Sequence, residues 1–134
     1  MIKCQYFGIG ELVPPSVYED RGDKAWALID PRLIEVLDSL RLQLDTELTV
    51  NNWHRAVSRT QSGLRTAESE HYSQYSQHSF GRAADVIGYP AEEIRQAIRS
   101  KEIVLPYPVW IELEVDWLHV DVRNSSDPVT FFRP

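Results

Sequence analysis

Cysteine and long apolar runs are scarce in this chain of 134 residues. Its single cysteine, Cys4, excludes an internal disulfide and a structural zinc site built from several thiolates. No segment approaches the roughly 20 consecutive apolar residues of a membrane-spanning helix. The N-terminus also lacks the apolar stretch of a signal peptide, so we expect synthesis in the cytoplasm without export by the usual route. Any metal site must therefore use nitrogen and oxygen ligands.

Runs of basic residues are absent as well. Fourteen Lys and Arg against 20 Asp and Glu give a formal net charge of −6. Because phosphate binding requires a concentrated basic surface, we expect no nucleic-acid partner. The composition is that of an ordinary globular protein, with 43% hydrophobic and 25% charged residues. We interpret 1–134 as one domain, large enough to bury a core, and expect a monomer without a membrane span.

The secondary-structure pattern predicts an α+β domain. We interpret 1–30 as an irregular arm, because Pro14 and Pro15 oppose a helix across that stretch. Asp30 is a suitable cap for the first long helix. The polar segment 54–76 has no period, and a loop of this length in a small domain is usually functional. The predicted elements are helices over 31–45 and 91–101 and strands over 48–53, 83–87, 109–115 and 118–122.

The alternation of apolar residues changes phase in the last third of the chain. Apolar residues occupy odd positions over 109–115 and even positions over 118–122. Since successive side chains of a strand point to opposite faces, one straight strand cannot contain this change. We therefore expect a turn or bulge near 114–116 that joins two strands. The second strand should then carry four side chains on the face opposite its apolar residues: Trp117, His119, Asp121 and Arg123.

Two short segments carry the residues best suited to catalysis. The segment from Ser76 to Asp85 holds His78 and a carboxylate seven positions apart, and His119 follows 34 residues after Asp85. Two imidazoles and one carboxylate can hold zinc at about 2.0–2.2 Å and leave the fourth position open, which is typical of catalytic sites. We therefore predict one Zn²⁺ ion with ligands His78, Asp85 and His119, and a hydrolase.

Hydrolysis at such a site also needs a general base and a group that stabilises the oxyanion. Asp116 lies three residues before the second histidine, at the predicted turn, and is the candidate base. Arg65, in the long polar loop, is the candidate partner for an anion. We interpret the two other histidines as exposed polar residues: His54 and His71.

These motifs resemble those of the zinc D-alanyl-D-alanine carboxypeptidase family. That family includes D-Ala-D-Ala dipeptidases, L-alanyl-D-glutamate endopeptidases of phage endolysins and, by fold, the hedgehog signalling domain. The resemblance covers about residues 30–123 and includes Ser62-Gly63-Leu64-Arg65, where the family has Ser-Gly-Tyr-Arg. It depends on eight positions: Ser76, His78, Gly81, Ala83, Asp85, Asp116, Trp117 and His119.

The resemblance implies a small α+β domain with a central antiparallel sheet, flanking helices and one zinc ion. It also implies hydrolysis of amide bonds in peptidoglycan stem peptides, with a peptidoglycan peptide as the partner. In the family the residue three before the last ligand is the base, here Asp116, with Glu114 as the alternative. The family's arginine binds substrate, here Arg65, with Arg55 as the alternative.

Two other functions fit the same motifs. One is a non-catalytic binding module that keeps the metal for structure, and the other is a phage structural or assembly protein. Carboxypeptidase, dipeptidase and endopeptidase members share the motifs, so the cleaved bond stays open. An enzyme without an export signal would act on the cell wall only after release, which makes a phage origin and host lysis the expected setting.

Overall fold

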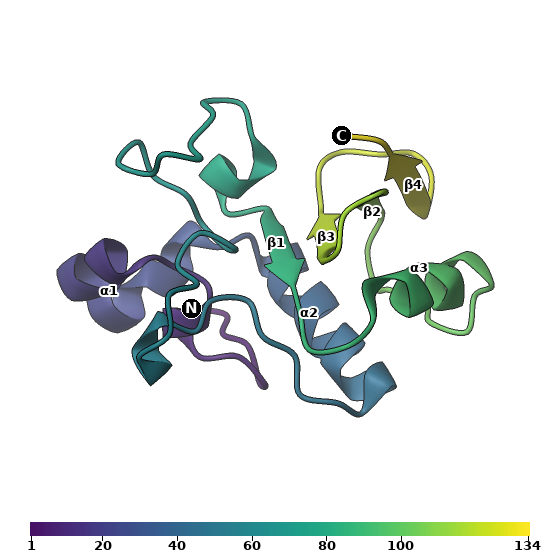
Figure 1. Ribbon diagram of the computed structural model, residues 1–134, viewed down its shortest axis with the longest axis horizontal. Helices are drawn as coiled ribbons and strands as arrows, with labels where there is room; N and C mark the ends of the chain where they lie inside the picture. Colours follow the sequence, from purple (N-terminus) through teal and green to yellow (C-terminus); the bar gives the residue numbers. More distant parts are fainter.

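The computed structural model describes all 134 residues and consists of one four-stranded sheet with three α-helices (Figure 1). The α+β prediction is confirmed. None of the helices has the length and apolar character needed to cross a membrane. The helices are α1 (Pro15–Arg21), α2 (Pro31–Leu44) and α3 (Ala91–Arg99). The strands are β1 (Ala83–Val86), β2 (Val109–Glu112), β3 (Leu118–Asp121) and β4 (Val129–Phe132).

The sheet is mixed, with the strand order β1-β3-β2-β4. The pairs β1–β3 and β2–β3 are antiparallel, but β2–β4 is parallel. The expected wholly antiparallel sheet is therefore wrong at one edge. The reason is that the chain reverses after β3, so β4 runs opposite to β3 and hence in the same direction as β2. Sequence reasoning did not predict β4.

The two faces of the sheet differ in character. Residues paired across strands share a face, and Ala84 pairs with Val120, which in turn pairs with Ile111. This face is buried in the same core as the apolar side of α2, which lies behind the sheet in Figure 1. The opposite face carries Asp85 paired with His119. One face of the sheet therefore builds the core, and the other is free to carry a site.

Helix α2 forms where the sequence predicts it. Pro31 occupies the first turn, and the Asp30 carboxylate accepts a hydrogen bond of 2.9 Å from the Arg32 backbone N–H. The helix ends at Leu44, because Asp45 adopts a left-handed conformation with φ 48°. Its apolar stripe is buried: Leu33, Ile34, Val36, Leu37 and Leu40.

Two predictions for the first half of the chain are wrong. Residues 1–30 are not irregular, because α1 begins at Pro15. A proline fits the first turn of a helix, where its missing N–H would have had no partner. The predicted strand over 48–53 is reduced to one bridge, between Thr49 and Ile87. Beyond that bridge the Asn51 N–H donates to the carbonyl oxygen of Glu11 in the N-terminal segment, and not to a neighbouring strand.

The predicted turn between β2 and β3 is confirmed, since Glu114 has a φ of 63°. Arg95 of α3 anchors this turn from inside the protein. Its guanidinium donates to the carbonyl oxygens of Glu112 at 3.1 Å, Val115 at 2.6 Å and Trp117 at 2.7 Å. Arg95 is 3% exposed, and these carbonyls satisfy most of its donors. The turn is therefore fixed against α3.

Gly81 sets the position of a short 3-10 helix, Gln77–Phe80, that precedes β1. Its φ of +67° lies in the left-handed region, and an added Cβ would overlap the Leu28 carbonyl oxygen. Only glycine allows both the conformation and the close approach. This turn holds His78 beside the first strand.

Replacing Gly81 with alanine should lower the free energy of unfolding by about 2–5 kcal/mol, from left-handed backbone strain plus steric overlap. Ala56→Gly measures the backbone part alone, because Ala56 has a left-handed backbone like that of Gly81, with φ 60° and ψ 30°. It should raise the free energy of unfolding by about 1–2 kcal/mol. Urea unfolding measures both variants. A loss in Gly81→Ala no larger than the gain in Ala56→Gly would contradict the role of the Leu28 contact.

Candidate metal centre

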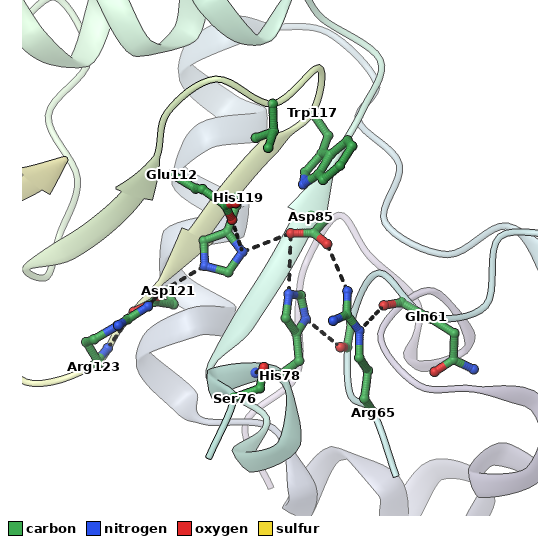
Figure 2. A network of polar contacts seen from close by, with 12 residues as sticks. Gln61, Arg65, Ser76, His78, Asp85, Glu112, Trp117, His119, Asp121 and Arg123 are labelled. Atoms are coloured by element: carbon green, nitrogen blue, oxygen red, sulfur yellow. Dashed lines mark hydrogen bonds and ion pairs between the residues drawn. The ribbon is translucent and has the colours of Figure 1, made fainter. Parts of the chain in front are cut away.

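The three predicted ligands converge on one point of the polar sheet face (Figure 2). His78 comes from the short helix before β1, Asp85 from β1 and His119 from β3. One ligand atom from each residue lies within 4.8 Å of the others, and all three residues are buried. Residues that are far apart in the sequence thus form a site that could hold a metal ion.

One oxygen of Asp85 faces both histidines. Its Oδ1 lies 2.9 Å from Nδ1 of His119 and 3.4 Å from Nε2 of His78. The other oxygen, Oδ2, accepts from Nη2 of Arg65 at 3.2 Å. Burial alone would raise the pKa of Asp85, but hydrogen bonds from His119 and His78 outweigh burial and hold the pKa well below its usual value. The carboxylate is therefore ionised, as a metal ligand must be.

The other nitrogen of each histidine is held by an acceptor. His78 Nδ1 lies 2.9 Å from the Gly63 carbonyl oxygen, and His119 Nε2 lies 2.8 Å from Oδ2 of Asp121. A carbonyl or a carboxylate can only accept, so these nitrogens carry the hydrogen atoms. A metal ion would therefore bind the nitrogens that face Asp85, in place of their hydrogen bonds to that carboxylate. Such outer partners are the rule for histidines that hold a metal.

His119 carries a proton that a metal ion would displace. Burial by itself lowers the pKa of His119, but hydrogen bonds with Asp121 and Asp85 outweigh it and raise the pKa to about 9. At neutral pH the free ring is therefore positively charged and pairs with both carboxylates. A bound cation would take over that charge, and its binding would release one proton.

Asp121 and Arg123 form a support behind His119. Asp121 is fully buried and accepts two bonds from Arg123, Nε to Oδ1 at 2.8 Å and Nη2 to Oδ2 at 2.6 Å. The guanidinium lies over the rings of Trp110 and Phe132, 4.6 and 4.9 Å from their centroids. Sequence reasoning placed Asp121 and Arg123 on this face without assigning them a role; their alternation with His119 was the available signal.

Arg65 reaches the site because its loop is docked on both sides. The Leu64 N–H bonds to the Leu12 carbonyl at 2.8 Å, and the Asp85 N–H bonds to the Ser62 carbonyl at 2.8 Å. Between them Gly63 lies so close to Leu12 that a side chain would overlap its backbone. Arg65 Nε then donates to the Gln61 carbonyl at 2.7 Å.

The alternative arginine, Arg55, is not at the site. Its guanidinium is half exposed and pairs with Glu47 at 3.2 Å. The remaining histidines are both exposed, as expected. His54 packs its ring edge-on against Trp53, and His71 pairs with Glu70.

The carboxylate beside the ligands is Glu112, which sequence reasoning did not single out. Its Oε2 lies 3.8 Å from His119 Nδ1, and its side chain is 19% exposed. Continued by one residue, the register of β2 and β3 places Glu112 opposite His119 on the polar face. Extended strands alternate faces, so a residue three before a ligand lies on the other face unless the backbone bends back.

The structure does not bring the predicted base, Asp116, to the metal centre. Asp116 is exposed and lines a different cavity beside α3, together with Arg95. The reason is that Arg95 of α3 donates to the carbonyl oxygens of the residues before and after Asp116, Val115 and Trp117, and so fixes the turn against α3. The alternative, Glu114, is exposed and pairs with Arg133.

A cavity of about 360 Å³, here called the metal cavity, opens beside the three ligands. It is large enough for a small organic ligand, and most of the residues that line it are polar or charged. Besides His78, Asp85 and His119, its wall includes Arg65, Tyr75, Glu112, Trp117, Arg123 and Phe132. The arrangement combines metal ligands, a carboxylate that is not a ligand and two guanidinium groups around one accessible space.

Comparison of the chain with protein-family models, curated proteins and solved structures finds no match. The function is therefore inferred from the geometry of the site and from the residue pattern that resembles the peptidase family.

Replacing Asp121 with asparagine should weaken the binding of Zn²⁺, used as the probe ion, about 10- to 100-fold. The reason is that the amide is a poorer acceptor for Nε2 of His119 and a poorer partner for Arg123. Competition with a chromophoric chelator measures the affinity. Asp127→Asn, the same change at an exposed position, is the control. An unchanged affinity in Asp121→Asn, with the fold intact by circular dichroism, would contradict the supporting role.

Proposed function

We propose that this chain is a zinc-dependent peptidase that hydrolyses amide bonds in peptidoglycan stem peptides. The observation that carries the proposal is the convergence of His78, Asp85 and His119 on the wall of an accessible cavity. Two nitrogens and one oxygen from buried, oriented side chains are a donor set that suits zinc. The resemblance of the motifs to the peptidoglycan peptidases supports the substrate class.

A bound zinc ion would supply a Lewis acid and lower the pKa of coordinated water toward about 7. Glu112 is placed to accept the proton of the attacking water and to deliver it to the leaving amine as the C–N bond breaks. Its carboxylate faces the metal cavity beside His119 and has no arginine or lysine partner. Proton transfer by such a positioned group typically contributes about 10²- to 10⁴-fold to the rate.

Arg65 is placed to stabilise negative charge on the substrate. Its guanidinium is held by the Gln61 carbonyl and by Asp85 Oδ2, so its orientation is set before substrate binds. It lines the metal cavity next to the ligands. A preorganised cation at this place can stabilise the developing oxyanion.

Metal analysis and digestion of peptidoglycan test the proposal together. The purified protein should bind one Zn²⁺ per chain and release peptide fragments with new amino groups, identified by mass. A chelator should stop the release, and added Zn²⁺ should restore it. His119→Ala should lose both the metal and the activity. Zinc binding without hydrolysis of any wall fragment would favour the non-catalytic module instead, and absence of metal binding would overturn the proposal.

Glu112→Gln should lower kcat about 10²- to 10⁴-fold while zinc stays bound, because an amide cannot accept the proton. Asp116→Asn is the matched variant and should keep near-normal activity, since its side chain lies outside the metal cavity. Steady-state kinetics on the released fragments and metal analysis measure the two effects. Loss of activity in Asp116→Asn, with Glu112→Gln active, would restore the base expected from the sequence.

A further inference from the structure

A second cavity adjoins the metal centre on the side away from Glu112. This loop cavity, of about 450 Å³, lies along the polar loop between Ser58 and His71. Three residues line both cavities: Arg65, Asp85 and Trp117. Figure 2 shows Glu112 and Arg123 on one side of Asp85, with Gln61 and Arg65 on the other. The two cavities therefore meet at Asp85, and the two candidate histidine ligands line the metal cavity.

The size of both cavities fits a substrate that continues past the metal centre. Each cavity lies within the roughly 300–1,000 Å³ typical of sites for small ligands. Both are open to solvent. An enzyme that removes only a terminal residue needs a wall close to the metal on one side. Here the space beside the ligands continues past Asp85 into the loop cavity.

The arginines next to the ligands are already engaged with carboxylates. Arg123 makes two bonds to Asp121, and Arg65 pairs with Asp85. In the metal cavity this leaves no unpaired cation dedicated to a C-terminal carboxylate. The loop cavity instead offers hydrogen-bonding side chains and Arg59, which forms no ion pair and whose Nε has no hydrogen-bond partner. These groups suit a polar stretch of peptide.

We propose that the substrate runs through both cavities and is cut at an internal amide bond, which makes the enzyme an endopeptidase. This inference rests on the hydrolase function proposed above. Water adds a hydroxyl group to the acyl carbon and a proton to the departing amine, and both products keep peptide on their side of the metal centre. The loop cavity binds one of these two portions, with Arg59 as a contact.

Stem pentapeptides with different ends test the inference directly. One peptide is acetylated at its N-terminus and amidated at its C-terminus, and two others each have one free end. The doubly blocked peptide should be cleaved at an internal bond at a rate comparable to the others. If only a peptide with a free C-terminus or a free N-terminus is cleaved, the inference is wrong while the hydrolase function stands. If the zinc-loaded protein cleaves none of them or peptidoglycan, the hydrolase function itself fails.

Arg59→Ala tests the loop cavity separately. It should raise KM for the doubly blocked peptide about tenfold and leave kcat largely unchanged, because a charged hydrogen bond to bound peptide is lost. Arg55→Ala is the matched control, since Arg55 lines neither cavity. Equal kinetics for the two variants would show that the loop cavity does not hold substrate.

Discussion

The buried carboxylate of Asp85 is the constraint on which the candidate site depends. Asp85 is 6% exposed, and an ionised group in such a place costs several kcal/mol unless it is paired and hydrogen-bonded. Three groups meet this requirement: His78, Arg65 and the protonated ring of His119. Each of the three is positioned by a different part of the fold. The loop before β1 positions Arg65, the tight turn at Gly81 positions His78, and the β1–β3 register positions His119 beside the Asp85 carboxylate. A metal ion between the histidines would satisfy the same requirement.

The alternation of strand residues explains how a small sheet can supply both a core and a site. The register aligns Asp85 with His119, and by continuation His119 with Glu112, which is paired with Phe132. One row across four strands thus holds two candidate ligands, the candidate base and an aromatic wall. The residues on the opposite face of β1, β2 and β3 are buried in the core that they share with α2. The site needs no structural layer of its own, because the core packing that fixes the strands also fixes the positions of the side chains in this row.

The convergence of His78, Asp85 and His119 could be predicted because residue type and spacing in two short motifs were sufficient for it. The phase change after Val115 likewise predicted the turn and the face of His119. Glu112 shares that face, but its role depends on the pairing of β2 with β3, which becomes visible only in the structure. The expectation for Asp116 followed chain distance from His119, and it did not include the anchoring of the turn by Arg95, 21 residues earlier. Strand β4 has only four residues, and nothing local specifies its parallel pairing with β2.

The fold separates the candidate metal ligands from the groups that would determine substrate specificity. The metal ligands lie on strands and a tight turn, whereas the groups that would face substrate lie mainly on the loop between Ser58 and His71. Arg65 is the connection, because it belongs to that loop and also holds Oδ2 of Asp85. Under the proposed function, changes elsewhere in the loop would alter which peptide binds without moving the candidate ligands. A change that shifts Arg65 would affect both peptide binding and the metal, since Asp85 would lose the partner that directs its Oδ1 toward the histidines.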